Sequence, residues 1–194
     1  MPVVPEPAAL RVTDDHWLLP ARHCPSPNCN ARPEGMAIAL LVVHGISLPP
    51  GEFGGPYIDA LFCNRLDPAT HPYFASIAGL EVSSHLLIRR DGEIVQYVPF
   101  DRRAWHAGRS HYAGRDNCND FSIGIELEGC DDVPYAEAQY RQLAAVIRVL
   151  EARYPGCRNA CVGHSDIAPG RKTDPGPAFD WHYLHQLRHK EGAR

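Results

Sequence analysis

The sequence predicts an α/β fold, a single domain in which one central mixed β-sheet is packed by helices. The first predicted strand is a continuous apolar run at residues 38–43. Two apolar runs joined by a turn follow at residues 82–88 and 93–98, and a strictly alternating run lies at residues 122–128. Strands separated by helices, with one clear hairpin among them, are typical of a mixed sheet covered by helices. The 194 residues suit one domain with a single sizeable core.

Residues 1–34 are rich in proline, asparagine and arginine, and we expect them to form an irregular arm that lies on the domain. The first strand, residues 38–43, is apolar throughout and is therefore expected to be buried on both faces. It ends at His44. A rigid loop rich in proline and glycine follows, and a short helix is expected at residues 57–62, directly after Pro56.

The middle of the chain is predicted to contain a hairpin, a long loop and a strand. Asp91-Gly92 between two apolar runs is a strong hairpin signal. Residues 101–120 have the character of a long surface loop, and loops beyond ~12–15 residues in a compact domain are usually functional or disordered. Residues 122–128 alternate between apolar and polar side chains, which predicts a half-buried strand.

Two helices are predicted in the C-terminal part of the chain. Asp132 is expected to cap the first, which ends at the proline-glycine pair 155–156. Its apolar residues recur at helical spacing: Leu143, Val146, Ile147, Leu150 and Tyr154. The second is expected at residues 179–188. Its predicted inward-facing residues are Trp181, Leu184 and Leu187.

Composition and charge exclude several classes of function. The net charge is −4 without a long basic run, so neither nucleic acid nor an anionic membrane surface is an expected partner. The longest apolar run, residues 37–43, is far shorter than the ~20 residues that span a bilayer. The N-terminus lacks the basic start of a secretory signal, and the seven cysteines are scattered. We therefore expect a cytoplasmic monomer with reduced thiols.

The segment CVGHSDIAPGRKTDPGP, residues 161–177, has the composition of a loop built for chemistry, because it contains histidine, aspartate and cationic residues but almost nothing that packs a core. We expect His44, at the end of the first strand, to meet His164 and Asp174 around one zinc ion, because two imidazoles and a carboxylate can hold a catalytic zinc. From spacing alone, Asp166 competes with Asp174 as the carboxylate ligand. The alternative is that both histidines are structural.

Four segments closely resemble the AmpD amidases, which are zinc-dependent N-acetylmuramoyl-L-alanine amidases related to phage lysozyme-type amidases and peptidoglycan recognition proteins. The segments are LLVVHGISLPPGEFGGP, HLLIRRDGEIVQYVPFDRRAWHAG, CNDFSIGIELEG and GHSDIAPGRKTDPGPAFDW. The resemblance covers residues 17 to 181. It implies that His44, His164 and Asp174 bind zinc, which selects Asp174 over Asp166.

The resemblance also implies a reaction. Zinc-activated water would attack the amide between the lactyl group of (1,6-anhydro)-N-acetylmuramic acid and L-alanine. Glu126 would act as the general base and acid, with Glu128 the competing carboxylate on the same strand face, and Lys172 would stabilise the oxyanion. The cellular role would be cytosolic peptidoglycan recycling, with an influence on β-lactamase induction.

Several residues are candidates for binding the muropeptide. Trp105 and Tyr57 offer aromatic rings for a sugar face, His106 is expected to line the groove, and Arg89 offers a guanidinium for the carboxylates of the stem peptide. Four further arginines are weaker candidates: Arg90, Arg102, Arg103 and Arg109. The family carries arginines at the positions of Glu81 and Asn117, so the resemblance implies rearranged peptide contacts in this chain.

Two other functions are compatible with parts of the sequence. A non-catalytic muropeptide-binding module would keep the groove but lose a zinc ligand, whereas all the implied positions are filled here. A cysteine-dependent hydrolase would use Cys118, Cys130 or Cys161, but no nucleophile motif surrounds them. A second, structural zinc held by cysteines has unconvincing spacings.

Overall fold

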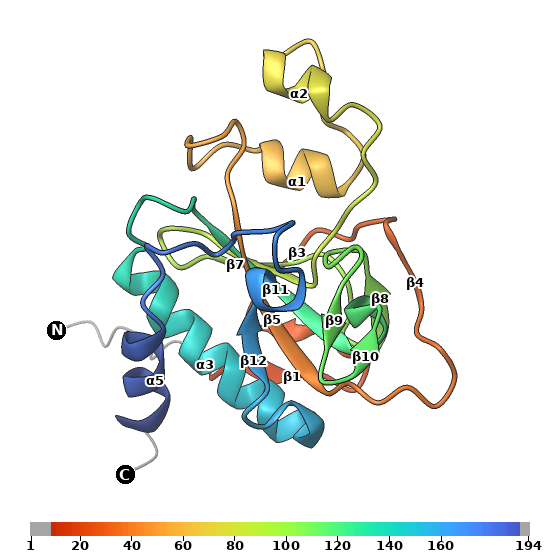
Figure 1. The fold of residues 1–194 in the computed structure, drawn as a ribbon, viewed down its shortest axis with the longest axis vertical. Coiled ribbons are helices and arrows are strands. Elements are labelled where there is room, and N and C mark those ends of the chain that lie inside the picture. Colours follow the sequence, from red (N-terminus) through yellow and green to blue (C-terminus); the bar gives the residue numbers. More distant parts are fainter. Residues whose placement is uncertain (1–8, 191–194) are drawn as a thin grey trace, which may run out of the picture.

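The computed structural model describes residues 9–190, and a mixed sheet of six strands forms the centre of this part of the chain (Figure 1). In spatial order the strands are β12 (Cys161–Gly163), β5 (Leu40–Ile46), β11 (Ser122–Glu128), β6 (Leu86–Ile88), β7 (Ile94–Gln96) and β3 (Arg22–His23). The first four run parallel to one another. β6 and β7 are antiparallel and form the hairpin predicted at Asp91-Gly92. The predicted fold class is confirmed.

Helices and short strands complete the described fold. The α-helices are α1 (Tyr57–Phe62), α2 (Pro72–Ser76), α3 (Glu137–Arg153), α4 (His164–Ile167) and α5 (Trp181–Lys190). The short strands are β1 (Arg11–Val12), β2 (Leu18–Leu19), β4 (Cys29–Ala31), β8 (Arg102–Ala104), β9 (His111–Tyr112) and β10 (Arg115–Asp116). Two 3₁₀ helices are η1 (Cys118–Asp120) and η2 (Pro155–Cys157).

The two faces of the sheet have different covers. Leu41 and Val43 of β5 belong to the main core, together with the apolar residues of α3. Helix α5 packs against α3 (Figure 1). Leu40 and Val42 point to the opposite face, where they pack with Ala107, Cys118, Phe121 and Ile167. Because side chains alternate along a strand, His44 follows Leu40 and Val42 onto this second face. The functional face is therefore the one that turns away from α3.

Strand β11 has the predicted bounds but not the predicted burial. All seven of its residues are buried, because β11 lies between β5 and β6 and both of its faces are covered. Ser122, Gly124 and Glu126, which the alternation predicts on a solvent-facing side, are buried instead, and Ser122 and Gly124 lie against the ring of His106. Alternation along this strand separates two buried environments.

The N-terminal arm and the long loop are more regular than expected. Arm strands β1 and β2 pair with each other, β3 joins the main sheet at β7, and β4 pairs with β8. Arg32 anchors the arm because its guanidinium donates hydrogen bonds to the carbonyl oxygens of Phe100, Asn119, Asp120 and Ser122. Residues 1–8 of the predicted arm lie outside the described residues.

The long loop at residues 101–120 contains β8, β9, β10 and η1, and it includes buried residues such as Ala107 and Cys118. It is therefore not a surface loop throughout.

Helix α3 begins after Ala136, whose N–H donates to the Gln139 side chain, so the predicted cap at Asp132 is wrong. Leu184 is buried as predicted, whereas Trp181 is 37% exposed.

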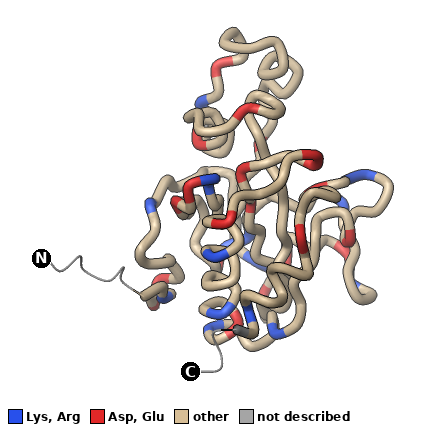
Figure 2. The backbone as a smooth tube through the Cα atoms, turned by 90° about the vertical axis from the view of Figure 1, so that its left-hand side faces the viewer, with Lys and Arg blue, Asp and Glu red and all other residues tan. Residues whose placement is uncertain are grey.

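Basic and acidic residues are interspersed along the chain rather than gathered by sign (Figure 2). In the described part of the chain, the helices are too short or too polar for any of them to cross a membrane.

Candidate metal centre

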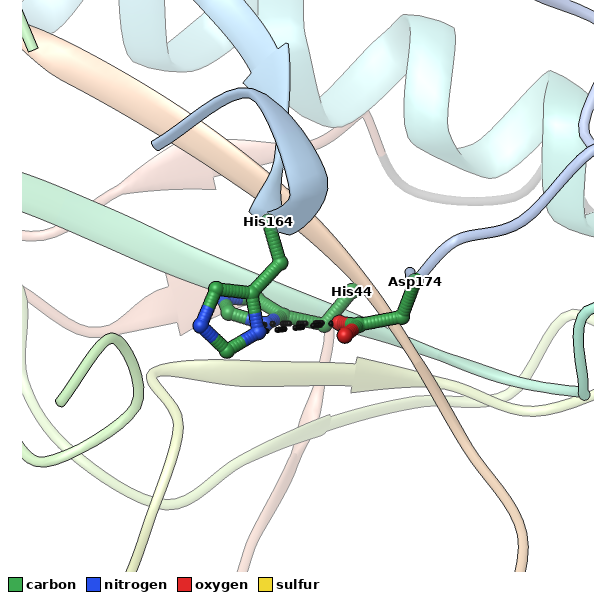
Figure 3. A group of neighbouring side chains, drawn as sticks. All are labelled: His44, His164 and Asp174. Atoms are coloured by element: carbon green, nitrogen blue, oxygen red, sulfur yellow. Dashed lines mark hydrogen bonds and ion pairs between the residues drawn. The ribbon is translucent and has the colours of Figure 1, made fainter. Parts of the chain in front are cut away.

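Three predicted ligands meet at the carboxyl edge of the parallel strands, where α/β proteins commonly bind ligands. His44 lies near the end of β5, and His164 is the first residue of α4, directly after β12. Asp174 lies in the loop that follows α4, and its carbonyl oxygen accepts a hydrogen bond from the Ser165 N–H at 3.0 Å. Figure 3 shows the three side chains converging on one point.

The facing atoms of these side chains form a nearly equilateral triangle. His44 Nδ1 lies 3.0 Å from His164 Nδ1, and Asp174 Oδ2 lies 3.2 Å from the first and 3.1 Å from the second. Zinc bonds to nitrogen and oxygen are roughly 2.0–2.2 Å long, so neighbouring ligand atoms of a tetrahedral zinc are about 3.3 Å apart. The triangle therefore has the size of one face of a zinc tetrahedron.

Hydrogen bonding alone cannot satisfy this triangle. The carboxylate oxygen only accepts, so each imidazole would have to donate from Nδ1 to reach it, and two N–H groups would then face each other. A cation resolves the conflict because all three atoms can direct lone pairs at it. The donor set fits a zinc ion and forms a candidate metal site.

The far sides of both imidazoles support the same assignment. His164 Nε2 lies 3.2 Å from the carbonyl oxygen of Ala107, which can only accept, so the proton of His164 lies on Nε2. His44 Nε2 lies 2.9 Å from His106 Nδ1. With protons on both Nε2 atoms, both Nδ1 atoms present lone pairs to the triangle.

The protonation states suit metal binding. Burial lowers the pKa of His44 to about 4, so this imidazole is neutral near pH 7, as a metal ligand must be. Burial by itself would raise the pKa of Asp174. The close contacts of its Oδ2 with the imidazoles of His164 and His44 in the metal-free site outweigh that effect and lower this pKa below its ordinary value. The site therefore combines a neutral imidazole with a carboxylate.

Asp166, the competing carboxylate, has a different task. Its Oδ2 accepts a hydrogen bond from the Gly163 N–H at 2.7 Å, across the first turn of α4. This contact fixes the start of the helix that carries His164. Asp166 is exposed and does not belong to the triangle.

Glu126 lies beside the triangle and has an unusual environment. It is paired in register with His44 across β11 and β5. Its Oε2 is buried, and no hydrogen-bond partner for it exists among the described residues. Burial, with a smaller contribution from Asp174, raises the pKa of Glu126 well above its ordinary value. Strongly perturbed carboxyl groups in a cleft are typical of acid–base catalysts.

Glu128, two residues further along β11, is fully engaged. Its Oε1 accepts from the Gly54 N–H at 2.6 Å and forms an ion pair with Arg89, while its Oε2 accepts from the Arg90 N–H. It therefore tethers the loop between β5 and α1 to the sheet. This difference separates two carboxylates that the sequence alone left as competitors.

A cleft of about 490 Å³ opens over the triangle. Lys172 is exposed and lines it, as do Trp105 and His106. The apolar side of the cleft includes Leu48, Tyr73, Ile77, Leu80 and Val82. Tyr73 and Leu80 were not singled out from the sequence, because the loop and single helical turn that carry them have no periodic pattern.

Two predicted substrate contacts lie elsewhere. Tyr57 packs against Phe74, with ring centroids 4.9 Å apart, and does not line the cleft. Arg89 also does not line it, and its guanidinium is bound by Asp59, Glu93 and Glu128. Neither side chain is presented to a ligand at the triangle in this structure.

The thiols near the site do not resemble a nucleophile. Cys118 is fully buried, and burial raises the pKa of Cys161 to about 12. A thiol that rarely ionises is a poor nucleophile. Cys130 lines the cleft, but no hydrogen bond joins it to a histidine of the described residues that could activate it. The geometry disfavours the cysteine-dependent alternative.

The carboxyl edge of the parallel strands presents two histidines, an aspartate and a buried glutamic acid. This arrangement defines the class of protein as a candidate metal-dependent hydrolase. Residues 34–177 match the Amidase_2 family, described as N-acetylmuramoyl-L-alanine amidase. The chain belongs to this family of N-acetylmuramoyl-L-alanine amidases.

Individual relatives cover nearly the whole chain. The 1,6-anhydro-N-acetylmuramyl-L-alanine amidase AmpD of Escherichia coli K12 is 65% identical over 175 residues, which are 90% of this chain and 96% of the relative. A crystal structure of a selenomethionine AmpD derivative has a TM-score of 0.89 at 64% identity, covering 91% of this chain and 98% of that one. Pseudomonas aeruginosa AmpDh3, crystallised with anhydromuramic pentapeptide, has a TM-score of 0.58 at 31% identity, covering 81% and 62%.

Proposed function

We propose that this protein hydrolyses the amide bond between the lactyl group of 1,6-anhydro-N-acetylmuramic acid and L-alanine, and that it uses one zinc ion. The observation that carries the proposal is the His44–His164–Asp174 triangle with the carboxyl of Glu126 beside it, whose buried Oε2 has no hydrogen-bond partner in the described part of the chain. The substrate is suggested by the E. coli relative, which is named for this amide, and by the ligand bound to the P. aeruginosa relative.

His44, His164 and Asp174 would hold the zinc. When bound, zinc supplies a Lewis acid that polarises a carbonyl and makes water reactive near neutral pH. Two neutral imidazoles and a single carboxylate leave a net positive charge at the centre, which preserves that Lewis acidity. The tautomers described above support this ligand set.

Glu126 would move the proton. Its raised pKa brings it closer to the range in which a carboxyl group both accepts and donates protons efficiently near neutral pH. It would take a proton from the attacking water and deliver it to the nitrogen of L-alanine as the C–N bond breaks. The products are a lactyl carboxylate and a free amine at the end of the stem peptide.

Lys172 would stabilise the negative charge that develops on the carbonyl oxygen. Its side chain lines the cleft, and its charge acts on both Glu126 and His44. An ammonium group aimed at a developing oxyanion is a strong stabilising element in a site that excludes water. Because Lys172 is exposed, a bound substrate would complete that exclusion.

Trp105 and His106 would contact the substrate from the cleft wall. The indole of Trp105 is oriented by a hydrogen bond from Nε1 to Asn30 Oδ1 at 2.7 Å, and its apolar ring would pack against a sugar ring in the cleft. Tyr57 and Arg89 do not line the cleft, so the proposal gives them no contact with the substrate. We propose a cytoplasmic monomer that acts in peptidoglycan recycling and thereby influences β-lactamase induction.

The test is a paired digest followed by mass spectrometry. One sample receives soluble anhydro-muropeptide and the other intact sacculi, each with and without a chelator. Release of stem peptide from the soluble substrate, lost with chelator and restored by zinc, is the expected result. Cleavage of both substrates would overturn the narrow specificity. Binding of muropeptide without cleavage would make the chain a non-catalytic recognition module.

A further inference from the structure

We propose that two consecutive residues, His106 and Ala107, set the tautomers of both zinc-binding histidines, and that Asn119 is the positioning residue that holds this dipeptide in place. The inference rests on the zinc site of the proposed function. It assigns His106 a second task besides lining the cleft, and it assigns Asn119 a task that the sequence did not indicate.

The His106 side chain fixes His44. His44 Nε2 lies 2.9 Å from His106 Nδ1, and His106 Nε2 lies 3.1 Å from the hydroxyl of Ser122. When a cation occupies the triangle, His44 Nδ1 has no proton, so its Nε2–H must donate to His106 Nδ1. His106 then carries its own proton on Nε2 and donates it to Ser122 Oγ. The hydrogen bonds therefore all point the same way, from His44 through His106 to Ser122 of β11.

The Ala107 main chain fixes His164. Its carbonyl oxygen accepts a hydrogen bond from His164 Nε2–H at 3.2 Å. The same oxygen accepts from Arg171 Nη2 at 2.6 Å, and Arg171 also donates to the carbonyl oxygen of Arg109. A change at Ala107 would leave the carbonyl in place, so this contact depends on the path of the backbone.

Asn119 controls that path with a single atom. Its Oδ1 accepts hydrogen bonds from the His106 N–H at 3.1 Å and from the Ala107 N–H at 2.8 Å. Asn119 is only 6% exposed, and its own carbonyl is bound by Arg32. One side-chain oxygen therefore orients two peptide groups, and through them both imidazoles of the metal site.

The sheet provides a fitted seat for His106. Gly124 lies between Ser122 and Glu126 on the functional face of β11, and a Cβ at Gly124 would lie 2.5 Å from His106 Cγ. The ring of His106 fills the space that a side chain would otherwise occupy. His85 meets this ring edge to face, with centroids 5.8 Å apart. The orientation of His106 is thus fixed by packing as well as by hydrogen bonds.

The first test measures zinc affinity by competition with a chromogenic chelator. Partners that orient metal-binding histidines typically contribute 10–100-fold to metal affinity. We expect Asn119→Ala and His106→Leu to weaken zinc binding by about that factor, and Asn119→Asp and His106→Asn, which keep an acceptor oxygen, to recover much of it. His111→Ala is the matched control, because His111 lies in the same loop but is exposed and bonds only Asp116 among the described residues.

The second test is NMR of the zinc-loaded protein with isotope-labelled histidine. The wild-type protein should show protected Nε2–H signals for His44 and His164. His106→Leu should lose protection at His44 and keep it at His164, whereas Asn119→Ala should weaken both. A general loss of stability would not produce this selective pattern.

Two outcomes would overturn the inference. Folded Asn119→Ala and His106→Leu variants with zinc affinity within about twofold of His111→Ala would show that the dipeptide does not support the ligands. Equal protection of both imidazoles in His106→Leu would do the same. Absence of zinc binding in the wild-type protein would instead remove the proposed function, and this inference with it.

Discussion

Glu126 and His44 are direct neighbours across the parallel pair of β11 and β5. The register places the carboxyl of Glu126 beside an imidazole of the metal triangle, and it places Glu128, two residues further along β11, beside Ile46. Two buried glutamates on one strand face therefore differ in their partners, because Glu128 is held by Gly54, Arg89 and Arg90 whereas Glu126 Oε2 has no hydrogen-bond partner among the described residues.

Replacing Glu126 by glutamine should remove turnover and preserve metal binding. The amide cannot accept a proton from water, and general acid–base catalysis is typically worth about 10²–10⁴-fold in rate. Because Glu126 is outside the triangle, the zinc content should stay at one ion per chain. Stem-peptide release followed by mass spectrometry and metal analysis by emission spectrometry would check both. A Glu126→Gln enzyme with near wild-type rate would refute the assignment of the proton carrier.

Replacing Glu128 by alanine should act mainly on stability. The carboxylate is 2% exposed, and removing it leaves the Gly54 N–H without its acceptor and Arg89 with one ion pair fewer. Loss of a buried ion-pair partner of this kind costs on the order of 3 kcal/mol of unfolding free energy. Glu128→Gln keeps an acceptor oxygen and should cost less. Urea denaturation of both variants gives the comparison, and equal costs would contradict the tether.

The sequence was sufficient for those parts of the site that depend on local pattern. The apolar run before His44 predicted a strand buried on both faces, and residues Leu40 to Val43 are indeed fully buried. Parallel strands bring their carboxyl ends to one edge, so the meeting of His44 and His164 follows from two strand ends. The choice between Asp166 and Asp174 needed the family resemblance, because it depends on which carboxylate caps α4.

The remaining features depend on contacts between segments that have no periodicity. Asn119 lies in a 3₁₀ turn and acts on His106 and Ala107 through one oxygen, and nothing in the local sequence of any of the three indicates the others. The half-buried assignment of residues 122–128 failed for a related reason. Alternation in the sequence indicates that the two faces of β11 differ in polarity. It does not indicate that a loop with its own polar groups covers the polar face.

His85 should make the protein sensitive to acid. It is fully buried, and burial together with Arg32 lowers its pKa to about 3. The unfolded chain binds a proton at this residue near pH 6.5, so between about pH 6.5 and pH 3 the unfolded state holds one proton more. Stability is therefore complete above that window and falls, by up to about 1.4 kcal/mol per pH unit, as the pH decreases through it.

The measurement is urea denaturation of metal-free wild-type and His85→Asn proteins at several pH values between about 5 and 7. Asparagine can still accept the hydrogen bond that the Gly124 N–H donates to His85 Nδ1. The His85→Asn protein should be less stable overall. The slope of its unfolding free energy against pH should be smaller by the equivalent of about one proton. Parallel pH profiles for the two proteins would show that His85 does not titrate on unfolding.

Gly124 offers a way to perturb the metal site without removing any polar group. In Gly124→Ala the new methyl would lie 2.5 Å from His106 Cγ, so the His106 ring must shift, which disturbs its 2.9 Å contact with His44 Nε2. Overpacking of this kind typically costs about 1–3 kcal/mol, and the displaced ring should also weaken zinc binding.

In a His106→Ala background the same methyl enters vacant space, and its cost should largely disappear. A double-mutant cycle on unfolding free energy and zinc affinity therefore predicts strong coupling between the two positions, beyond about 0.5 kcal/mol. Additive effects of the two substitutions would mean that Gly124 and the His106 ring do not interact. The packing of His106 against Gly124 on β11 would then not hold the histidine that orients His44.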